Sequence, residues 1–204
     1  AVVSTINGDA NVPFYRELGN QGIDAGDIPV IAFSVGEQEL SGLDTTPLVG
    51  HLAAWNYFMS VDNDANHAFI DAWQAWKRDP NAVTNDPMEA HYIGFKLWVK
   101  AVEKAGTTNV DAVRTAIHGL KVPNLTGGVA EMLPNHHITK PVLIGEIQAD
   151  GQFEVVWQTP GTVPGDAWSD FLPGSRDLMS DWRAPVNCGN FNTKTKRCGG
   201  SNAA

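Results

Sequence analysis

The densest group of hydrogen-bonding side chains in this sequence lies in residues 84–90, just before a long apolar-periodic segment. Asp86 has the type and position of a helix N-cap, Pro87 suits the first helical turn, and Glu89 stands where a capping box places an acid. Asn85 adds an amide directly before them. Two interpretations stay open: the segment caps a helix and does no more, or its oxygens line a cleft at the helix entrance.

Further polar and aromatic side chains follow three segments that we expect to be strands. They are Asn7, Gly8 and Asp9 after the first strand, Ser34 and Glu37 after the second, and Trp55 and Tyr57 after the third. In open α/β sheets, ligands bind at the carboxyl ends of the strands, where the loops diverge. We therefore predict a small-molecule site at this edge. The alternative for Asn7 and Asp9 is an Asx turn that caps the next helix. For Trp55 and Tyr57 we favour internal packing over a wall of the site.

Alternation between the strand and helix periodicities places these residues on an α/β fold. Residues 1–54 give a β-α-β-α-β pattern, with strands at 2–5, 29–33 and 48–54 and helices at 11–22 and 37–40. Helices follow at 65–77 and 86–105, and a third one ends at Gly119. The remaining expected strands are one after Gly127-Gly128 and two at 142–148 and 153–158, which Asp150-Gly151 joins as a hairpin. The chain therefore changes from a mixed first part to helices and then to strands.

Apolar side chains recur at helical spacing along residues 86–105. They are Met88, Tyr92, Phe95, Val99 and Val102, with Ile93, Leu97 and Trp98 beside them. So wide an apolar stripe predicts a helix that is buried on a broad face.

Composition excludes several classes of partner. The chain has 204 residues, which suits one large domain or two small lobes, and a formal net charge of -9 with only 14 Lys and Arg. Nucleic acid is not an expected partner, because phosphate binding needs clustered cations. No apolar run approaches the roughly 20 residues that span a bilayer. The first residues form neither a signal peptide nor a usual translation start, so we expect a fragment of a longer protein.

The common catalytic and metal motifs fail the spacing test. The sequence contains no GxSxG, GxxxxGK[ST], HExxH or GxGxxG. Residues 62–66 begin like a calcium loop, but His67 replaces the required glycine and Trp73 the bidentate glutamate. His136 and His137 are neighbours on an expected strand, where their side chains point to opposite faces, so we do not expect them to share a metal ion. We predict no catalytic residue, no cofactor and no metal.

Cys188 and Cys198 lie close together in a Gly- and Asn-rich tail. A disulfide between them would restrain the tail by roughly 2–3 kcal/mol on the chain-entropy model and suits an oxidising compartment. Two thiols without a CxxC or a nearby His pair leave a zinc shell incomplete, so the disulfide is favoured over a metal. The sequence leaves open whether the two cysteines pair within one chain.

Five segments together carry a resemblance to a known family. Residues 3–9, 50–58, 84–90, 101–108 and 140–148 resemble the urea and short-chain amide substrate-binding proteins of ABC transporters. The match runs from Val2 to about Pro173 and covers only the C-terminal half of a family member. The resemblance implies an α/β fold with type I periplasmic-binding-protein architecture, two flavodoxin-like lobes joined by a multi-strand hinge, present here as a C-terminal fragment.

The same resemblance implies how the chain is divided. Residues 1–54 would belong to the second lobe, 55–58 to a hinge crossing, 59–145 to a part that returns to the first lobe, and 146–173 to a hinge hairpin that leads back. Residues 174–204 form a tail that does not match the family pattern.

The implied function is that of a periplasmic or extracellular solute-binding protein. It would bind urea or a short-chain amide between the lobes without catalysis and deliver it to a membrane permease. The missing N-terminal half would be its partner in binding, since so small a ligand must be enclosed from both sides. The implied ligand-binding residues are Asn7, Gly8, Asp9, Ser34, Glu37, Trp55, Tyr57, Asn85, Asp86 and Glu89. The alternatives are an amide-sensing regulatory protein of the same fold and an enzyme that acts on amides.

Overall fold

The computed structural model describes residues 1–168, 171–181 and 188–198. The chain divides into two compact units, Ala1–Gly165 and Asp166–Ala204.

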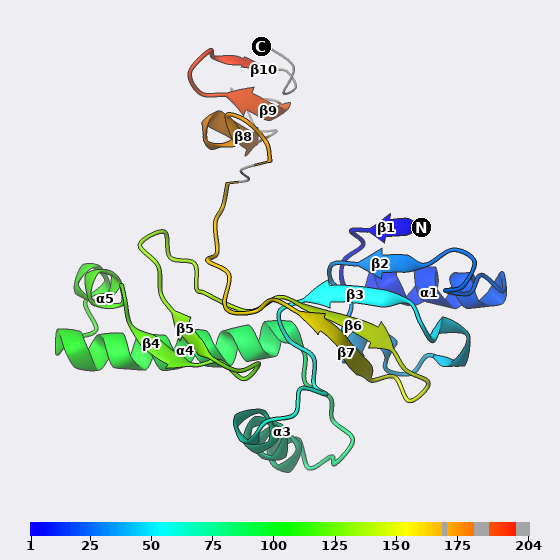
Figure 1. The fold of residues 1–204 in the computed structure, drawn as a ribbon. Helices are drawn as coiled ribbons and strands as arrows, with labels where there is room; N and C mark the ends of the chain where they lie inside the picture. Colours follow the sequence, from blue (N-terminus) through cyan, green and yellow to red (C-terminus); the bar gives the residue numbers. More distant parts are fainter. Residues whose placement is uncertain (169–170, 182–187, 199–204) are drawn as a thin grey trace. The chain divides into compact units, whose positions relative to one another are not determined.

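A five-stranded mixed sheet organises the first unit, with strand order β1-β2-β3-β6-β7 (Figure 1). Its strands are β1 (Val2–Ser4), β2 (Val30–Ala32), β3 (Leu52–Trp55), β6 (Leu143–Ile147) and β7 (Phe153–Gln158). The first three strands run parallel, while β6 is antiparallel to both β3 and β7. The three parallel strands are short apolar runs. Because they run in the same direction, their carboxyl ends meet at one edge of the sheet. The hairpin predicted at Asp150-Gly151 is confirmed.

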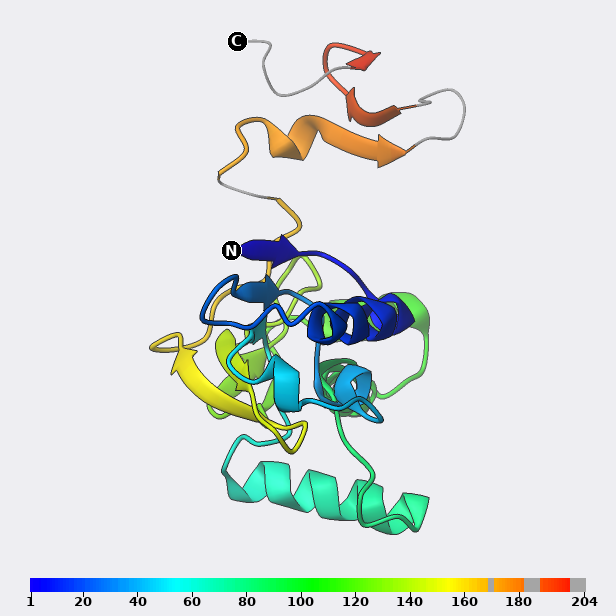
Figure 2. The same cartoon turned by 90° about the vertical axis from the view of Figure 1, so that its right-hand side faces the viewer.

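Short helices connect the parallel strands. They are η1 (Gly8–Ala10), α1 (Asn11–Asn20), α2 (Glu37–Leu40) and η2 (Thr46–Leu48). The expected strand at 48–54 was placed too early, because a 3₁₀ turn with Pro47 inside it precedes β3. Helix α1 packs on the sheet through Tyr15 and Leu18, which belong to one apolar core with side chains of β2, β3, β6 and β7 (Figure 2).

Three further helices and a small hairpin follow β3. These elements are α3 (Asp64–Lys77), α4 (Asp86–Ala105), α5 (Val110–Ala116), β4 (Lys121–Pro123) and β5 (Val129–Glu131). The antiparallel β4–β5 hairpin lies beside α4 (Figure 1). Side chains of both elements form a second apolar core, which contains Ile93, Leu97, Val122, Ala130 and Met132. Strand β4 was not predicted, since its three residues carry too little periodicity.

The bounds of α4 agree with the prediction, but its buried face does not. Ile93, Leu97 and Ala101 are fully buried, whereas Phe95 is 63% exposed and Trp98 is 44% exposed. The prediction of a broad buried stripe is therefore wrong for these two aromatic residues. The physical reason is that the β4–β5 hairpin covers one side of the helix and leaves Phe95 and Trp98, whose rings stack 5.8 Å apart, uncovered by the described residues.

The second unit contains a short turn and a three-stranded antiparallel sheet of order β10-β9-β8. Its elements are η3 (Ser175–Asp177), β8 (Leu178–Asp181), β9 (Cys188–Asn192) and β10 (Arg197–Cys198). Cys188 and Cys198 are joined by a disulfide, as predicted, and the bond lies within one chain. The disulfide joins β9 to β10 and so cross-links two strands of this small sheet.

Candidate functional site

The loops that follow β1 and β2 are held together by hydrogen bonds at the carboxyl edge of the sheet. Ser34 Oγ donates to the carbonyl oxygen of Ile6 at 2.8 Å. Asn11 Nδ2 donates to the carbonyl oxygens of Ile6 and Ser34, at 3.1 Å each. Asn11 is fully buried and was not among the predicted site residues. The sequence feature that could have identified Asn11 is its amide, which lies next to the polar turn at 7–9 and in the first turn of the expected helix. Ser34 and Asn11 therefore fix the positions of the two loops.

The turn after β1 presents exposed polar side chains beside those loops. Asn7 adopts an extended backbone at the start of η1 and makes no side-chain capping hydrogen bond. Asp9 is exposed, and the residue that caps α1 is Ala10, which has no capping side chain. Gly8 has φ 56°, a left-handed conformation that glycine adopts at little cost. Within the described residues, the side-chain oxygens of Asn7 and Asp9 are thus not used for helix capping.

The start of α4 differs from the sequence prediction in its cap. The N-cap is Asn85 and not Asp86, because Asn85 Oδ1 accepts the backbone N–H of Met88 at 3.0 Å. Asn85 Nδ2 donates to Gln38 Oε1, which connects α4 to the residues after β2. Pro87 then lies one position further into the helix than expected. Asp86 does not cap the helix, and its carboxyl lies near the Trp55 side chain and the Asn56 backbone.

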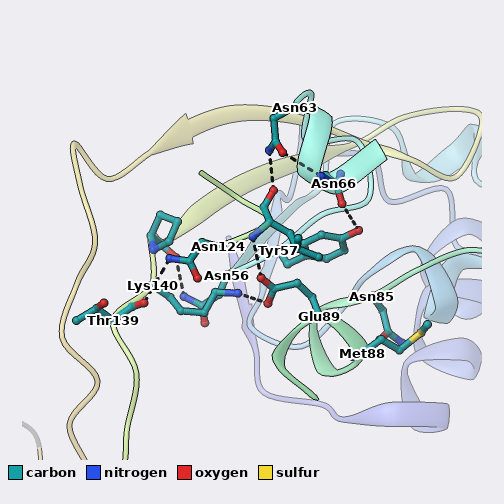
Figure 3. Close-up of polar contacts among 12 residues, drawn as sticks. Asn56, Tyr57, Asn63, Asn66, Asn85, Met88, Glu89, Asn124, Thr139 and Lys140 are labelled. Carbon is teal, nitrogen blue, oxygen red and sulfur yellow. Dashed lines mark hydrogen bonds and ion pairs between the residues drawn. The ribbon is translucent and has the colours of Figure 1, made fainter. Parts of the chain in front are cut away.

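Glu89 does not complete a capping box but forms a buried ion pair with Lys140 (Figure 3). The Glu89 side chain is 0% exposed and that of Lys140 is 9% exposed. Glu89 Oε1 also accepts the backbone N–H of Leu125 at 3.4 Å. Burial raises the pKa of Glu89, while Lys140 and the Leu125 N–H oppose that shift. Lys140 was missed in the sequence because 51 residues separate it from Glu89.

The carboxyl of Asp86 lies in the same electrostatic environment. Burial raises the pKa of Asp86 to about 6, and the Lys140 ammonium and Glu89 carboxylate act on it in opposite directions. Asp86 Oδ2 is buried without a hydrogen-bond partner among the described residues. Asp86 and Lys140 line a cavity of about 290 Å³ together with Asn56 and Val163.

Glu37 is enclosed at the start of α2. It is 1% exposed, and its Oε1 accepts the backbone N–H of Met59. Burial raises the pKa of Glu37 to about 8, and the carboxylates of Glu39 and Asp86 add to the shift. Glu37 lines a polar cavity of about 510 Å³ with Asp150, away from the cavity of Asp86.

The two aromatic candidates have different environments. Tyr57 is fully buried, and its hydroxyl is hydrogen-bonded to Asn66 Oδ1 at 2.8 Å and Thr84 Oγ1 at 2.7 Å. This arrangement agrees with the packing role that the sequence favoured. Trp55 is half-buried, and its ring lies so close to Gly36 that a Cβ added there would be 3.5 Å from a ring carbon.

The structure brings the predicted residues together in two groups. One group surrounds the ends of β1 and β2 and contains Asn7, Gly8, Asp9 and Ser34. The other surrounds the start of α4 and contains Trp55, Asn85, Asp86 and Glu89. The Asn85–Gln38 hydrogen bond connects the α4 group to the β2 loop. Glu37 and Asp86 line separate cavities, so these two carboxyls do not share a pocket.

Neither group contains the side chains of a metal centre. In the described part of the chain, no three His, Cys, Asp or Glu side chains lie close enough to hold an ion together. The same part has no helix whose length and apolar character would let it cross a membrane.

A match to a family model identifies the class of protein to which this chain belongs. Residues 1–174 match the family described as "Periplasmic binding protein domain". The chain is therefore a member of the periplasmic binding protein family, and the type I periplasmic-binding-protein fold expected from the sequence is confirmed.

Solved structures agree with that fold. A solute-binding protein of an ABC transporter from Rhodopseudomonas palustris HaA2, in complex with p-hydroxybenzoic acid, superposes with a TM-score of 0.66 at 24% identity over 77% of this chain and 44% of its own. The amino acid ABC transporter substrate-binding protein from Pseudomonas fluorescens Pf-5 gives 0.63 at 21% identity, over 82% of this chain and 44% of its own. The chain thus spans less than half the length of these proteins.

A curated relative matches a shorter stretch. Limonene hydroxylase from Geobacillus stearothermophilus is 25% identical over 115 residues, which are 56% of this chain and 21% of that protein. The chain spans about a fifth of this relative.

Proposed function

We propose that this chain belongs to an extracytoplasmic solute-binding protein that delivers urea or a short-chain amide to the permease of an ABC transporter. The observation that carries the proposal is the uncapped, exposed turn of Asn7 and Asp9 beside Ser34, at the carboxyl edge of the parallel strands in a periplasmic binding protein fold. Ligands of open α/β sheets bind at this edge. The ligand is bound and released, and none of its bonds is broken.

The residue types at this edge suit a neutral amide. Urea is planar and has more N–H donors than carbonyl acceptors, so a selective site needs several acceptor oxygens and an apolar plate. Asn7 and Asp9 supply acceptors, and the side-chain amide of Asn7 also offers N–H donors for the carbonyl oxygen of the ligand. Trp55, half-buried next to Gly36, supplies a flat apolar surface. The proposed amide specificity also rests on the segments that resemble the urea and short-chain amide binders.

Binding of so small a ligand requires a second lobe. With about four non-hydrogen atoms and a ceiling near 1.5 kcal/mol per atom, urea reaches roughly -6 kcal/mol, or tens of micromolar. Loss of contacts on one side would weaken binding to the millimolar range or beyond. We therefore propose that the described edge supplies one wall and that the rest of a full-length protein supplies the other.

The uncovered face of the helices supports a larger assembly of this kind. Trp76 of α3 is 73% exposed, and Phe95 and Trp98 of α4 form an exposed stack. A contiguous exposed apolar patch often marks a surface that another part of a protein covers, and the Phe95–Trp98 stack is such a patch. We propose that the first-lobe part of the protein, from outside this chain, packs on this face.

The direct test is isothermal titration of a full-length protein that contains this chain. Urea, acetamide and formamide are the expected ligands, and p-hydroxybenzoate and leucine represent solutes named for similar structures. Asn7→Ala should weaken amide binding by about tenfold or more, as expected for one lost hydrogen bond to an enclosed ligand. Asp27→Asn is the matched control, because Asp27 is an exposed carboxylate that precedes β2 at the opposite edge of the sheet.

Four outcomes would count against the proposal. Tight binding of an aromatic acid or leucine without any amide binding would reject the proposed specificity. Equal effects of Asn7→Ala and Asp27→Asn would reject the proposed edge. Micromolar binding of urea to the isolated 204-residue chain would reject the requirement for a second lobe. Release of ammonia from urea or acetamide would indicate an enzyme instead.

A further inference from the structure

The loop regions beside the β4–β5 hairpin contain a pair of histidines that the sequence did not connect. His118 follows α5 and His136 follows β5, and their Nε2 atoms lie 3.3 Å apart, so that one ring can donate a hydrogen bond to the other when no ion is bound. Their ring centroids are 4.7 Å apart, with the planes at 56°. The sequence directed attention to His136 and His137, but the structure pairs His136 with a residue 18 positions away.

The separation of the two nitrogens matches the geometry of a tetrahedral zinc ion. Zinc binds imidazole nitrogen at about 2.0–2.1 Å, so two such ligands at the tetrahedral angle lie about 3.3–3.4 Å apart. Imidazole is a preferred ligand of Zn²⁺, Cu²⁺ and Ni²⁺, whereas Mg²⁺ and Ca²⁺ prefer oxygen.

Backbone hydrogen bonds hold together the two segments that carry these histidines. Gly119, which follows His118, donates its N–H to the Met132 carbonyl oxygen at 2.8 Å. The His136 N–H in turn donates to the Leu133 carbonyl oxygen at 2.9 Å. Because Met132 and Leu133 are consecutive, these bonds place the two imidazole-bearing segments side by side.

His136 also has an unusual backbone. Its φ is 63°, in the left-handed region that glycine adopts freely and that asparagine, aspartate and histidine adopt more often than other residues. Glycine adopts this φ at less cost than histidine, so His136→Gly removes the imidazole without straining the backbone.

We propose that His118 and His136 form an open, exchangeable site for Zn²⁺ or a similar imidazole-preferring transition metal, bound through both Nε2 atoms. In the described part of the chain no third protein ligand joins them, so water or an exogenous ligand completes the coordination. The site lies outside both groups of proposed ligand-binding residues. It does not depend on the proposed transport function.

The test is titration of the untagged 204-residue chain with Zn²⁺, with Cu²⁺ and Mg²⁺ as comparison ions. One saturable Zn²⁺ site is expected, with tighter Cu²⁺ binding and no comparable Mg²⁺ binding. His118→Ala and His136→Gly should each weaken Zn²⁺ binding by at least tenfold. His137→Ala is the matched control and should leave binding unchanged, since His137 is an exposed neighbour outside the pair.

His136→Gly separates ligand loss from fold loss. The substitution relieves the left-handed strain, so the thermal midpoint of the metal-free variant should equal or exceed that of the wild type. Added Zn²⁺ should raise the midpoint of the wild type and of His137→Ala but not of His136→Gly. The proposal is wrong if the wild type shows no saturable Zn²⁺ binding, if either pair variant keeps it, or if His137→Ala loses it equally.

Discussion

The turn after β1 and the start of α4 contain the same kinds of side chain and use them in opposite ways. At the turn, Asn7 and Asp9 are exposed and cap no helix. At the start of α4, Asn85 caps the helix and Glu89 is neutralised by Lys140. An amide or a carboxylate that already forms a hydrogen bond or an ion pair within the fold would have to lose that interaction to bind a ligand, at a cost in free energy. We therefore propose that the turn after β1 serves ligand binding and that the start of α4 serves stability.

The largest expected effect comes from the buried pair at the start of α4. Lys140→Met leaves Glu89 charged and unpaired in the interior, which should lower the free energy of unfolding by about 3–5 kcal/mol. The double variant Glu89→Leu, Lys140→Met should recover most of that loss, because an apolar pair replaces two buried charges. Guanidinium unfolding measures both values.

A matched control for this pair lies on the β4–β5 hairpin. Lys121 and Glu131 are 3.1 Å apart, with side chains 60% and 38% exposed. Lys121→Met should cost less than about 1 kcal/mol, because water screens an exposed pair. Equal costs for Lys140→Met and Lys121→Met would remove the contrast on which the stability assignment depends.

The next effect is a dependence of stability on pH that Glu37 produces. Its pKa is raised from 4.5 to about 8 in the folded protein. Between these pH values the folded state holds a proton that the unfolded state has lost, so the free energy of unfolding should fall as pH rises, by roughly 3–5 kcal/mol over the full range. Asp86 acts in the same direction between pH 3.8 and about 6.

Glu37→Gln should reduce this slope, because glutamine does not titrate. Glu103→Gln, on the exposed side of α4, should leave the slope unchanged. Guanidinium unfolding at pH 5, 6.5 and 8 measures the slope. A wild-type stability that stays constant or increases over this range would contradict the burial of a protonated Glu37.

A smaller effect is expected at the helix cap. Asn85→Ala removes the acceptor of the Met88 N–H and should destabilise the protein by about 1 kcal/mol. Asp86→Asn should cost less, since Asp86 does not cap the helix. A larger loss of stability for Asp86→Asn than for Asn85→Ala would indicate that Asp86 is the N-cap, as the sequence predicted.

The smallest stability effect is expected at the turn after β1. Asn7→Ala and Asp9→Ala should each change the free energy of unfolding by less than about 0.5 kcal/mol, because both side chains are exposed. By contrast, Ser34→Ala, in the loop after β2, should cost about 1 kcal/mol, since it removes the hydrogen bond to Ile6. A large loss on Asn7→Ala would mean that the turn serves stability and would erase its contrast with α4.

The sequence by itself determined the elements that local patterns specify. The bounds of α4, the β6–β7 hairpin and the alternation of strands and helices before Trp55 follow from periodicity, caps and turn residues over a few neighbouring positions. The polar turn after β1 was also visible, because an Asn-Gly-Asp run after an apolar strand has a local meaning.

Only the tertiary structure decided which polar groups are already used. Lys140 reaches Glu89 across 51 residues, and His118 meets His136 across 18. It also decided which face of α4 is buried, since the hairpin that covers Ile93 and Leu97 comes later in the chain. Local sequence patterns fix backbone geometry and amphipathicity, whereas pairing and burial depend on long-range contacts that no short window contains.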